Sequence, residues 1–302
     1  MSYIQKIWLF LALFPALVFT TPTASAAPRV TLLKDRVYAT VDGADLLYDF
    51  AMPPEGQGPF PFVLCIHAGG WQLGNKKSYR DIARELAGRG YTAATIEYRL
   101  TPKHKWPAQL EDVQRAVDFF RANASAHKID PSRVGVVGDD AGAHLALMLA
   151  LTAAKEDTGK PVAQSHRVQA VVNFFAPLDL REWRVNSAWV ETKIRIGFMK
   201  SSEQIIEDFL GTRDRTAPIY AEVSPVSHVT AGAPPILTFI GTEDPLVPVA
   251  QAQTFHAALK HAGVEEELVM VEGQDHDREN INHDGKAFER MYAFFDKHLK
   301  GK

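Results

Sequence analysis

One short segment carries the residue types and spacing of a catalytic turn. Residues 138–142 read Gly-Asp-Asp-Ala-Gly and lie between an apolar run, Val134–Val137, and a helical stretch, His144–Ala153. With serine at the centre, the pattern G-x-S-x-G in this setting forms a strained strand-to-helix turn that lifts its central side chain above a sheet. The central residue here is Asp140. We therefore predict that a carboxylate stands where such turns usually present an attacking hydroxyl.

A candidate proton carrier and its carboxylate partner follow in the order that this turn requires. Asp244 comes after the apolar run Ile236–Ile240, and His276 comes after Glu267–Val271. Along the chain, a turn of this kind is followed first by an acid and then by a histidine. The sequence therefore predicts that His276 carries protons, while Asp244 fixes its tautomer and stabilises the imidazolium.

The elements that must position these residues are those of a mostly parallel sheet. Apolar, β-branched runs alternate with helical patterns, which is typical of α/β proteins with helices on both faces of the sheet. Val37–Thr40 and Leu46–Ala51, separated by Asp42-Gly43, predict an opening hairpin. The predicted parallel strands are Phe62–Ile66, Thr92–Glu97, Val134–Val137, Val168–Phe174, Ile236–Ile240 and Glu267–Val271.

One segment, Arg181–Pro218, departs from this alternation. It mixes aromatic residues such as Trp183 and Trp189 with charges, between two predicted strands. An insertion there would lie above the carboxyl ends of the strands, where ligands bind in open α/β sheets. We interpret it as a small lid or pocket wall, with a surface excursion that packs on its own side chains as the alternative.

Several motifs, in the right order, resemble one family. His67-Ala68-Gly69-Gly70-Trp71 resembles the H-G-G-G-W oxyanion motif of esterases related to hormone-sensitive lipase, and most closely that of the feruloyl- and acetylxylan-esterase-like branch, the BD-FAE-like family. The resemblance implies an α/β-hydrolase fold in one domain, hydrolysis of carboxylic esters (acylated or feruloylated carbohydrates), and no metal or organic cofactor. Further similar motifs are Glu97–Leu100, Trp106–Ala108, Glu111–Val113, Ile129–Val134, Gly241–Pro248 and Glu272–His276.

The same resemblance implies an oxyanion hole made by the backbone N–H groups of Gly69, Gly70 and Ala141. Such preorganised donors stabilise the charge that develops on a carbonyl oxygen, and each is typically worth about 3–4 kcal/mol. We expect Trp71 to contact substrate. We expect His67 to brace the loop rather than to act as the base.

Three hypotheses follow for Asp140. The leading one is a carboxylic-ester hydrolase that retains slow hydrolysis by water attack, since the hole and substrate binding alone still accelerate the reaction. The second is an impaired protein that binds esters or glycans, in which Asp140 pairs with His276 and raises its pKa, or enters its own oxyanion hole. The third is a covalent Asp nucleophile acting on alkyl halides or epoxides, as in haloalkane dehalogenases and epoxide hydrolases of the same fold.

The first residues resemble an export signal. Lys6 precedes the apolar run Ile7–Phe19, and Ala24-Ser25-Ala26 has the small residues of a cleavage site. This pattern predicts a secretory signal peptide over residues 1–26 and an exported domain, periplasmic or extracellular, over residues 27–302. The apolar run is short for a membrane span, which needs about 20 residues. We therefore expect no stable membrane insertion once the signal is removed.

Composition excludes several other classes of protein. The net charge is −3 and no basic stripe is present, which argues against a nucleic-acid partner. Cys65 is the single cysteine, so an internal disulfide is excluded, and its apolar surroundings predict a buried packing residue. His283 and Asp284, with nearby acidic residues, fit the spacing of no standard zinc or calcium loop. A small-molecule or carbohydrate ester remains the expected partner.

Overall fold

The structure is a computed structural model that describes residues 30–54, 56–156, 159, 165–184 and 200–301. The predicted signal peptide, residues 1–26, lies outside the described residues, as does part of the predicted insertion.

Eight strands form one sheet in the order β1-β2-β4-β3-β5-β6-β7-β8. β1 and β2 form an antiparallel hairpin at one edge, β2 pairs antiparallel with β4, and the remaining neighbours are parallel. The hairpin turns at Asp42 and Gly43, both with positive φ, as a two-residue hairpin loop requires. The strands are β1 Thr31–Val41, β2 Ala44–Met52, β3 Phe60–Ile66, β4 Thr92–Ile96, β5 Ile129–Asp139, β6 Ala170–Phe174, β7 Ile236–Gly241 and β8 Glu266–Val271.

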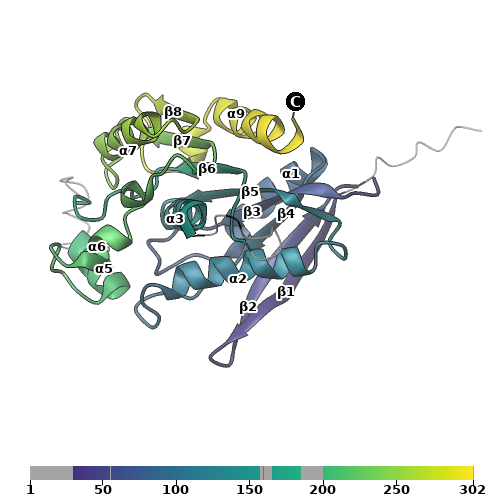
Figure 1. Ribbon diagram of the computed structural model, residues 1–302, viewed down its shortest axis with the longest axis horizontal. Helices are drawn as coiled ribbons and strands as arrows, with labels where there is room; N and C mark the ends of the chain where they lie inside the picture. The colour runs from purple at the N-terminus through teal and green to yellow at the C-terminus, as the bar shows by residue number, and fades with distance from the viewer. Residues whose placement is uncertain (1–29, 55, 157–158, 160–164, 185–199, 302) are drawn as a thin grey trace, which may run out of the picture.

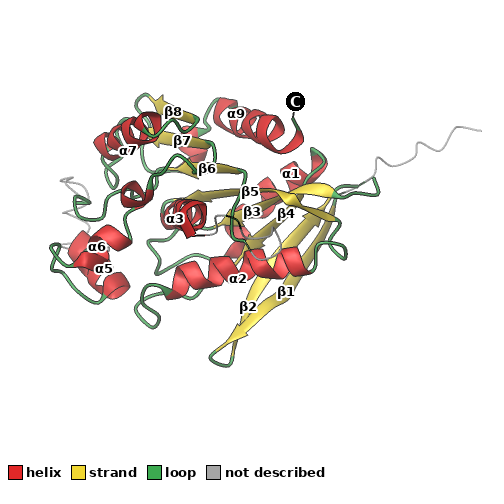
Figure 2. Cartoon of the chain, in the orientation of Figure 1, coloured by secondary structure: helices red, strands yellow, loops and turns green. Residues whose placement is uncertain are grey.

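Helices cover both faces of this sheet. In Figure 1, α2 and α3 lie on one side, and α1 and α9 lie on the other. The colouring of Figure 2 shows strands alternating with helices through the parallel part of the sheet. This arrangement confirms the predicted α/β-hydrolase architecture. The helices are α1 Arg80–Gly88, α2 Ala108–Ala122, α3 Ala141–Glu156, α5 Ser202–Leu210, α6 Pro218–Glu222, α7 Val249–His261, α8 Arg278–Ile281 and α9 Lys286–Phe295, with short helical turns η1 Lys76–Tyr79, η3 Pro225–His228 and η4 Asp296–Lys300.

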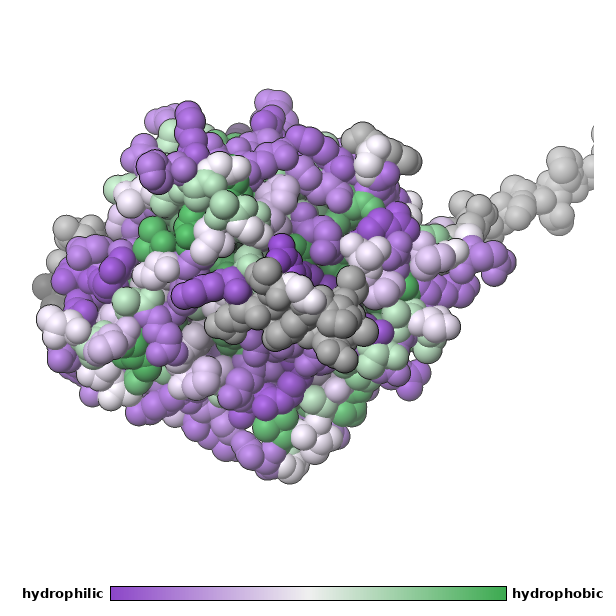
Figure 3. Space-filling view, in the orientation of Figure 1, coloured by the Kyte–Doolittle hydropathy of each residue, from purple (hydrophilic) through white to green (hydrophobic). Residues whose placement is uncertain are grey.

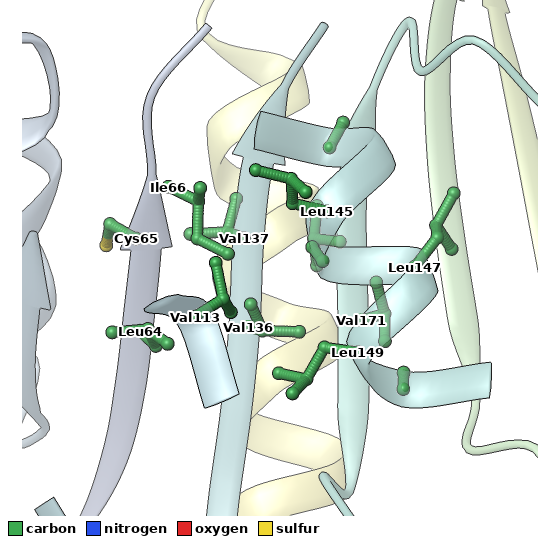
Figure 4. Close-up of a cluster of buried hydrophobic side chains, with 14 of the residues drawn as sticks. Leu64, Cys65, Ile66, Val113, Val136, Val137, Leu145, Leu147, Leu149 and Val171 are labelled. Carbon is green, nitrogen blue, oxygen red and sulfur yellow. The ribbon is translucent and has the colours of Figure 1, made fainter. Parts of the chain in front are cut away.

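The core lies between the central strands and α3. Leu64 and Ile66 of β3, Val136 of β5, and Leu145 and Leu149 of α3 have no exposed surface and pack together (Figure 4). Both neighbours of a central parallel strand are strands and both of its faces are covered, which explains why these strands are nearly continuous apolar runs. Cys65 is buried here as predicted, and burial raises the pKa of its thiol. This packing anchors the start of α3, and therefore the turn before it.

The described part of the predicted insertion includes α5, which lies beside the oxyanion loop, residues 67–75 between β3 and η1. A Cβ placed on Gly70 would lie 4.0 Å from Cγ2 of Ile205 in α5. Hydrophilic residues dominate the face of the molecule shown in Figure 3, with apolar residues scattered among them. Among the described helices, none has the length and apolar character needed to cross a membrane.

Candidate active site

Asp140 lies on a tight turn between β5 and α3. Its φ angle is 49°, in the left-handed region that side chains rarely adopt. A Cβ at Gly138 would lie 2.4 Å from the carbonyl carbon of Gly142, and a Cβ at Gly142 would lie 2.2 Å from the carbonyl oxygen of Ile66. The two glycines therefore allow the backbone to approach itself and β3 closely. This turn, the elbow (residues 138–142), thus has the predicted form and leaves the Asp140 side chain 16% exposed.

The loop after β3 directs two backbone N–H groups at the Asp140 carboxylate. Gly69 N–H and Gly70 N–H donate hydrogen bonds to Asp140 Oδ2, at 3.1 and 2.8 Å. Gly69 has φ 120°, and a Cβ there would lie 2.2 Å from the carbonyl oxygen of Leu73. The third predicted donor, Ala141, begins α3 directly after the elbow, but the bonds to the carboxylate come from the two glycines. The side chain of Asp140 thus occupies the position that the carbonyl oxygen of a substrate would need.

His276 and Asp244 meet beside the elbow. His276 Nδ1 and Asp244 Oδ2 are 2.7 Å apart, and Asp244 Oδ1 accepts hydrogen bonds from the backbone N–H groups of Leu246 and Val247. Because Asp244 accepts, the proton of the pair lies on Nδ1, and Nε2 faces the elbow. His276 Nε2 lies 3.8 Å from Asp140 Oδ1 and has no hydrogen-bond partner among the described residues. The structure thus brings all three predicted catalytic side chains together.

The two carboxylates hold His276 in its charged form. Burial of the ring opposes protonation, but Asp140 and Asp244 outweigh it and raise the pKa of His276 to about 10. For Asp140, burial opposes ionisation, but His276 and the N–H groups of Gly70 and Gly69 outweigh it and lower the pKa of the carboxyl group. At neutral pH the pair is therefore an imidazolium and a carboxylate. A protonated histidine cannot accept a proton from an attacking group.

The loop histidine is a support rather than a reacting group. His67 is buried, its Nδ1 lies 2.7 Å from the carbonyl oxygen of Ala68, and its ring stacks on Tyr98. Burial lowers the pKa of His67 to about 4, so the ring is neutral. These contacts are those of a brace for the oxyanion loop, as the sequence predicts.

The prediction that the Trp71 side chain contacts the substrate is wrong. Its side chain has no exposed surface, because it stacks on Phe209 at a ring separation of 4.2 Å and meets Trp183 and His144 edge-on. Its indole N–H donates to Nδ1 of His144 at 3.3 Å. The positive φ angle of Trp71, 61°, turns the side chain inward beneath the loop. Trp71 therefore packs under the oxyanion loop.

Sequence reasoning missed two groups that the structure places at the site. The ring of Phe175, which follows β6 with φ 45°, lies 4.2 Å from the ring of His276. Arg278 pairs with Asp139, the residue before Asp140, at 2.9 Å. Arg278 and Asp139 lie close in sequence to His276 and Asp140, which was a weak signal that they belong to the site. Spacing alone, however, predicts no ion pair between residues so far apart in the sequence.

The acidic residues around His276 have local structural partners. Asp277 caps α8 by accepting hydrogen bonds from the backbone N–H groups of Glu279 and Asn280, and Asp275 accepts one from the Asn280 side chain. Among the residues that the structure describes, no group of three or more potential ligands is arranged to hold a metal ion.

Comparison with known proteins places this geometry in a family. Residues 48–259 match the BD-FAE family. Esterase LipC of Mycobacterium tuberculosis is 30% identical over 252 residues, which cover 82% of this chain and 60% of LipC. The chain thus spans less than two thirds of that relative.

Two solved structures resemble the chain over most of its length. A thermophilic esterase from Thermogutta terrifontis superposes with a TM-score of 0.70 at 26% identity, covering 87% of this chain and 91% of that one. A truncated carbohydrate esterase from gut microbiota superposes with a TM-score of 0.74 at 22% identity, covering 91% and 99%, and supports the fold alone. With an elbow, an oxyanion loop and a histidine–carboxylate pair on this sheet, the chain belongs to the BD-FAE family of α/β-hydrolases.

Proposed function

We propose that this protein is an exported hydrolase of the carboxylic-ester class whose turnover is suppressed by Asp140. One observation carries the proposal: the N–H groups of Gly69 and Gly70 and the His276–Asp244 pair converge on a single side chain at the elbow. Acyl transfer requires this combination, because the donors stabilise the oxyanion while the histidine moves the proton. Export is proposed from the signal-like residues 1–26.

Acylated or feruloylated carbohydrate esters are the proposed substrates. Support comes from membership of the BD-FAE family. The apolar side chain of Ile205 beside Gly70 would border the part of the site that receives the acyl group. Activity on acetylated and feruloylated xylan oligosaccharides, compared with p-nitrophenyl acetate, tests this class. A preference for the synthetic ester by kcat/KM would contradict it.

Asp140 limits the reaction in two ways. Its Oδ2 must leave the hole before a substrate carbonyl oxygen can enter, and its charge keeps His276 protonated. Attack by Asp140 on an ester carbonyl would also form a mixed anhydride, a costly intermediate for a weak nucleophile. We therefore expect slow release of acid from activated esters by water attack. Replacing Asp140 with serine, which restores the missing hydroxyl, tests the proposal directly.

The different positions of the two carboxylate oxygens of Asp140 favour a second function, that of a hydrolase with an Asp nucleophile. Oδ2 is held in the hole, while Oδ1 faces His276. Oδ1 can displace a halide X⁻ from an sp³ carbon R: the new C–O bond forms as the C–X bond breaks, and X⁻ leaves with the bonding electron pair. The product is an alkyl ester of Asp140 whose carbonyl oxygen already lies in the hole. The charge on Asp140 is then gone, so the pKa of His276 falls, the imidazolium releases its proton to solvent, and the ring becomes a base.

Hydrolysis of that ester closes the cycle. Neutral His276 takes a proton from water, whose oxygen adds to the Asp140 carbonyl carbon, and collapse releases R–OH. The carboxylate and imidazolium are regenerated, so one water converts R–X into R–OH and HX. Incubating His276→Ala with 1,2-dibromoethane tests this route, because alkylation of Asp140 by a halide does not need His276, whereas hydrolysis of the alkyl ester does. A stable mass increase on Asp140 supports it, and its absence rejects it. A protein that only binds esters would show neither label nor turnover, and its saturable binding would be unaffected by His276→Ala.

A further inference from the structure

We propose that Arg278 is a positioning residue, which sets the location of His276 relative to the elbow and the oxyanion loop. This role deepens the proposed function of the site and rests on it. The residue belongs to α8, two positions after His276, and its side chain is 11% exposed.

One guanidinium joins the segments that carry the three parts of the site. Arg278 Nη1 donates to Asp139 Oδ2 at 2.9 Å, next to the elbow residue. Arg278 Nη2 donates to the carbonyl oxygen of Ser78 at 3.2 Å, in the helical turn that follows the oxyanion loop. The guanidinium carbon lies 4.3 Å from the centre of the Tyr79 ring, whose side chain is fully buried. The planar group is thus held by hydrogen bonds in its plane and by an aromatic ring against its face, a geometry that lysine cannot reproduce.

His276 needs such a support. Within the described residues, Asp244 is its hydrogen-bond partner, at Nδ1, and Nε2 faces Asp140 across 3.8 Å without a hydrogen bond. Asp244 and His276 both lie on loops after β7 and β8, so their bond does not fix either of them to the elbow after β5. Arg278 provides that link. A displacement of about 1 Å in a catalytic group can cost about 10²-fold in rate.

The pair is poorly suited to a purely stabilising role. Asp139 Oδ1 and Arg278 Nε are buried and have no hydrogen-bond partner in the described part of the chain. A buried ion pair with unsatisfied atoms contributes little net stability compared with apolar packing. The charged groups that face Arg278 are Asp139 and, at 3.6 Å, Glu279, and those that face His276 are Asp140 and Asp244. Asp139 also interacts electrostatically with His276, although no ion pair joins them.

The first test follows the titration of His276 by NMR in the full chain with Asp140 intact, so it needs no catalytic activity. We compare Arg278→Met with Arg89→Met. Arg89 is a matched control, since it also pairs with a carboxylate, Glu289, and lies 4.0 Å over a tyrosine ring, that of Tyr292, but joins α1 to α9.

Positioning and direct charge effects predict opposite signs in this test. If Arg278 holds His276 beside Asp140, its loss weakens that ion pair, and the pKa of His276 falls from about 10 toward its ordinary value. If Arg278 acts only as a nearby positive charge, its loss raises the pKa. A fall in Arg278→Met with no change in Arg89→Met supports positioning. A rise, no change, or an equal fall in both variants overturns it.

The second test measures ester hydrolysis in the Asp140→Ser background, with rates normalised to folded protein. We expect Arg278→Met and Arg278→Lys to lower kcat about 10–10²-fold with a smaller change in KM, and Arg89→Met to leave both within about twofold. An unchanged kcat in both Arg278 variants overturns the role. If Asp140→Ser itself is inactive while the titration test succeeds, the proposed function fails and the positioning of His276 stands.

Discussion

Replacing Asp140 with serine is the most informative perturbation of this protein. The change removes the carboxylate oxygen that accepts hydrogen bonds from Gly69 and Gly70, and it removes the negative charge 3.8 Å from His276. The hole opens, and the pKa of His276 falls because Asp244 becomes its remaining carboxylate partner. A hydroxyl then stands beside a histidine that can accept its proton.

The expected increase in kcat follows from the two donors that Asp140 occupies and from the nucleophile that is absent. Loss of a single oxyanion donor costs about 10²–10³-fold in kcat in a serine hydrolase. Two donors are occupied here, and the nucleophile is also absent. Loss of the nucleophile alone from an intact serine triad costs about 10⁶-fold in kcat. We therefore expect Asp140→Ser to raise kcat by about 10³-fold or more, up to the roughly 10⁶-fold limit set by the lost nucleophile.

The assay is release of p-nitrophenol from p-nitrophenyl acetate at pH 8, with a rapid-mixing measurement of the first turnover. Asp140→Ala is the matched control, because it opens the hole and frees His276 without supplying a hydroxyl. We expect it to be faster than the native chain but slower than Asp140→Ser, since an open hole and binding supply about 10³–10⁴-fold over water and the nucleophile supplies the rest. The serine variant alone should show a stoichiometric burst. If Asp140→Ser is no faster than Asp140→Ala, the hole and the His276–Asp244 pair are not arranged for acyl transfer, and the reasoning is refuted.

Three further predictions concern stability and packing. Asp140→Asn should lower Tm most near pH 5–6, as measured by calorimetry. A histidine whose pKa is raised from 6.5 to about 10 in the folded state contributes its full stability below pH 6.5 and loses it as the pH rises through about 10. A deficit in Tm that persists above pH 10 would contradict the ion pair. Gly69→Ala in the Asp140→Ser background should abolish most ester hydrolysis, because the added Cβ would lie 2.2 Å from the carbonyl oxygen of Leu73. Gly43→Ala is the control for a side chain at positive φ, because open space surrounds Gly43. Equal activity of the two variants would count against the loop geometry. Trp71→Ala should cost about 3–5 kcal/mol in urea unfolding because it empties a buried aromatic stack, and a changed ester preference without loss of stability would restore Trp71 as a substrate contact.

Local patterns determined much of the architecture. The apolar runs of 5–7 residues around Phe62–Ile66 and Ile236–Ile240 correspond to β3 and β7, because strands buried on both faces must be apolar throughout. The elbow was equally readable, since the close approaches at Gly138 and Gly142 leave no room for a side chain. The export of the chain and the role of the segment Arg181–Pro218 stay predictions.

The state of the site was decided by contacts between distant segments. The sequence predicts that Asp140, Asp244 and His276 belong together, but it leaves open whether the carboxylate attacks, pairs with His276 or enters the hole. The structure combines the last two, with Oδ2 in the hole and Oδ1 toward His276.

The two main surprises have the same origin. Trp71 lies in a motif beside the site, yet a positive φ angle and the ring of Phe209 turn it into the interior. Arg278 reaches a carboxylate 139 residues away and a carbonyl oxygen 200 residues away. Periodicity and turn residues act over a few positions and therefore determine elements. The direction of a side chain at the junction of three loops depends on how those elements pack, and only the tertiary structure contains that information.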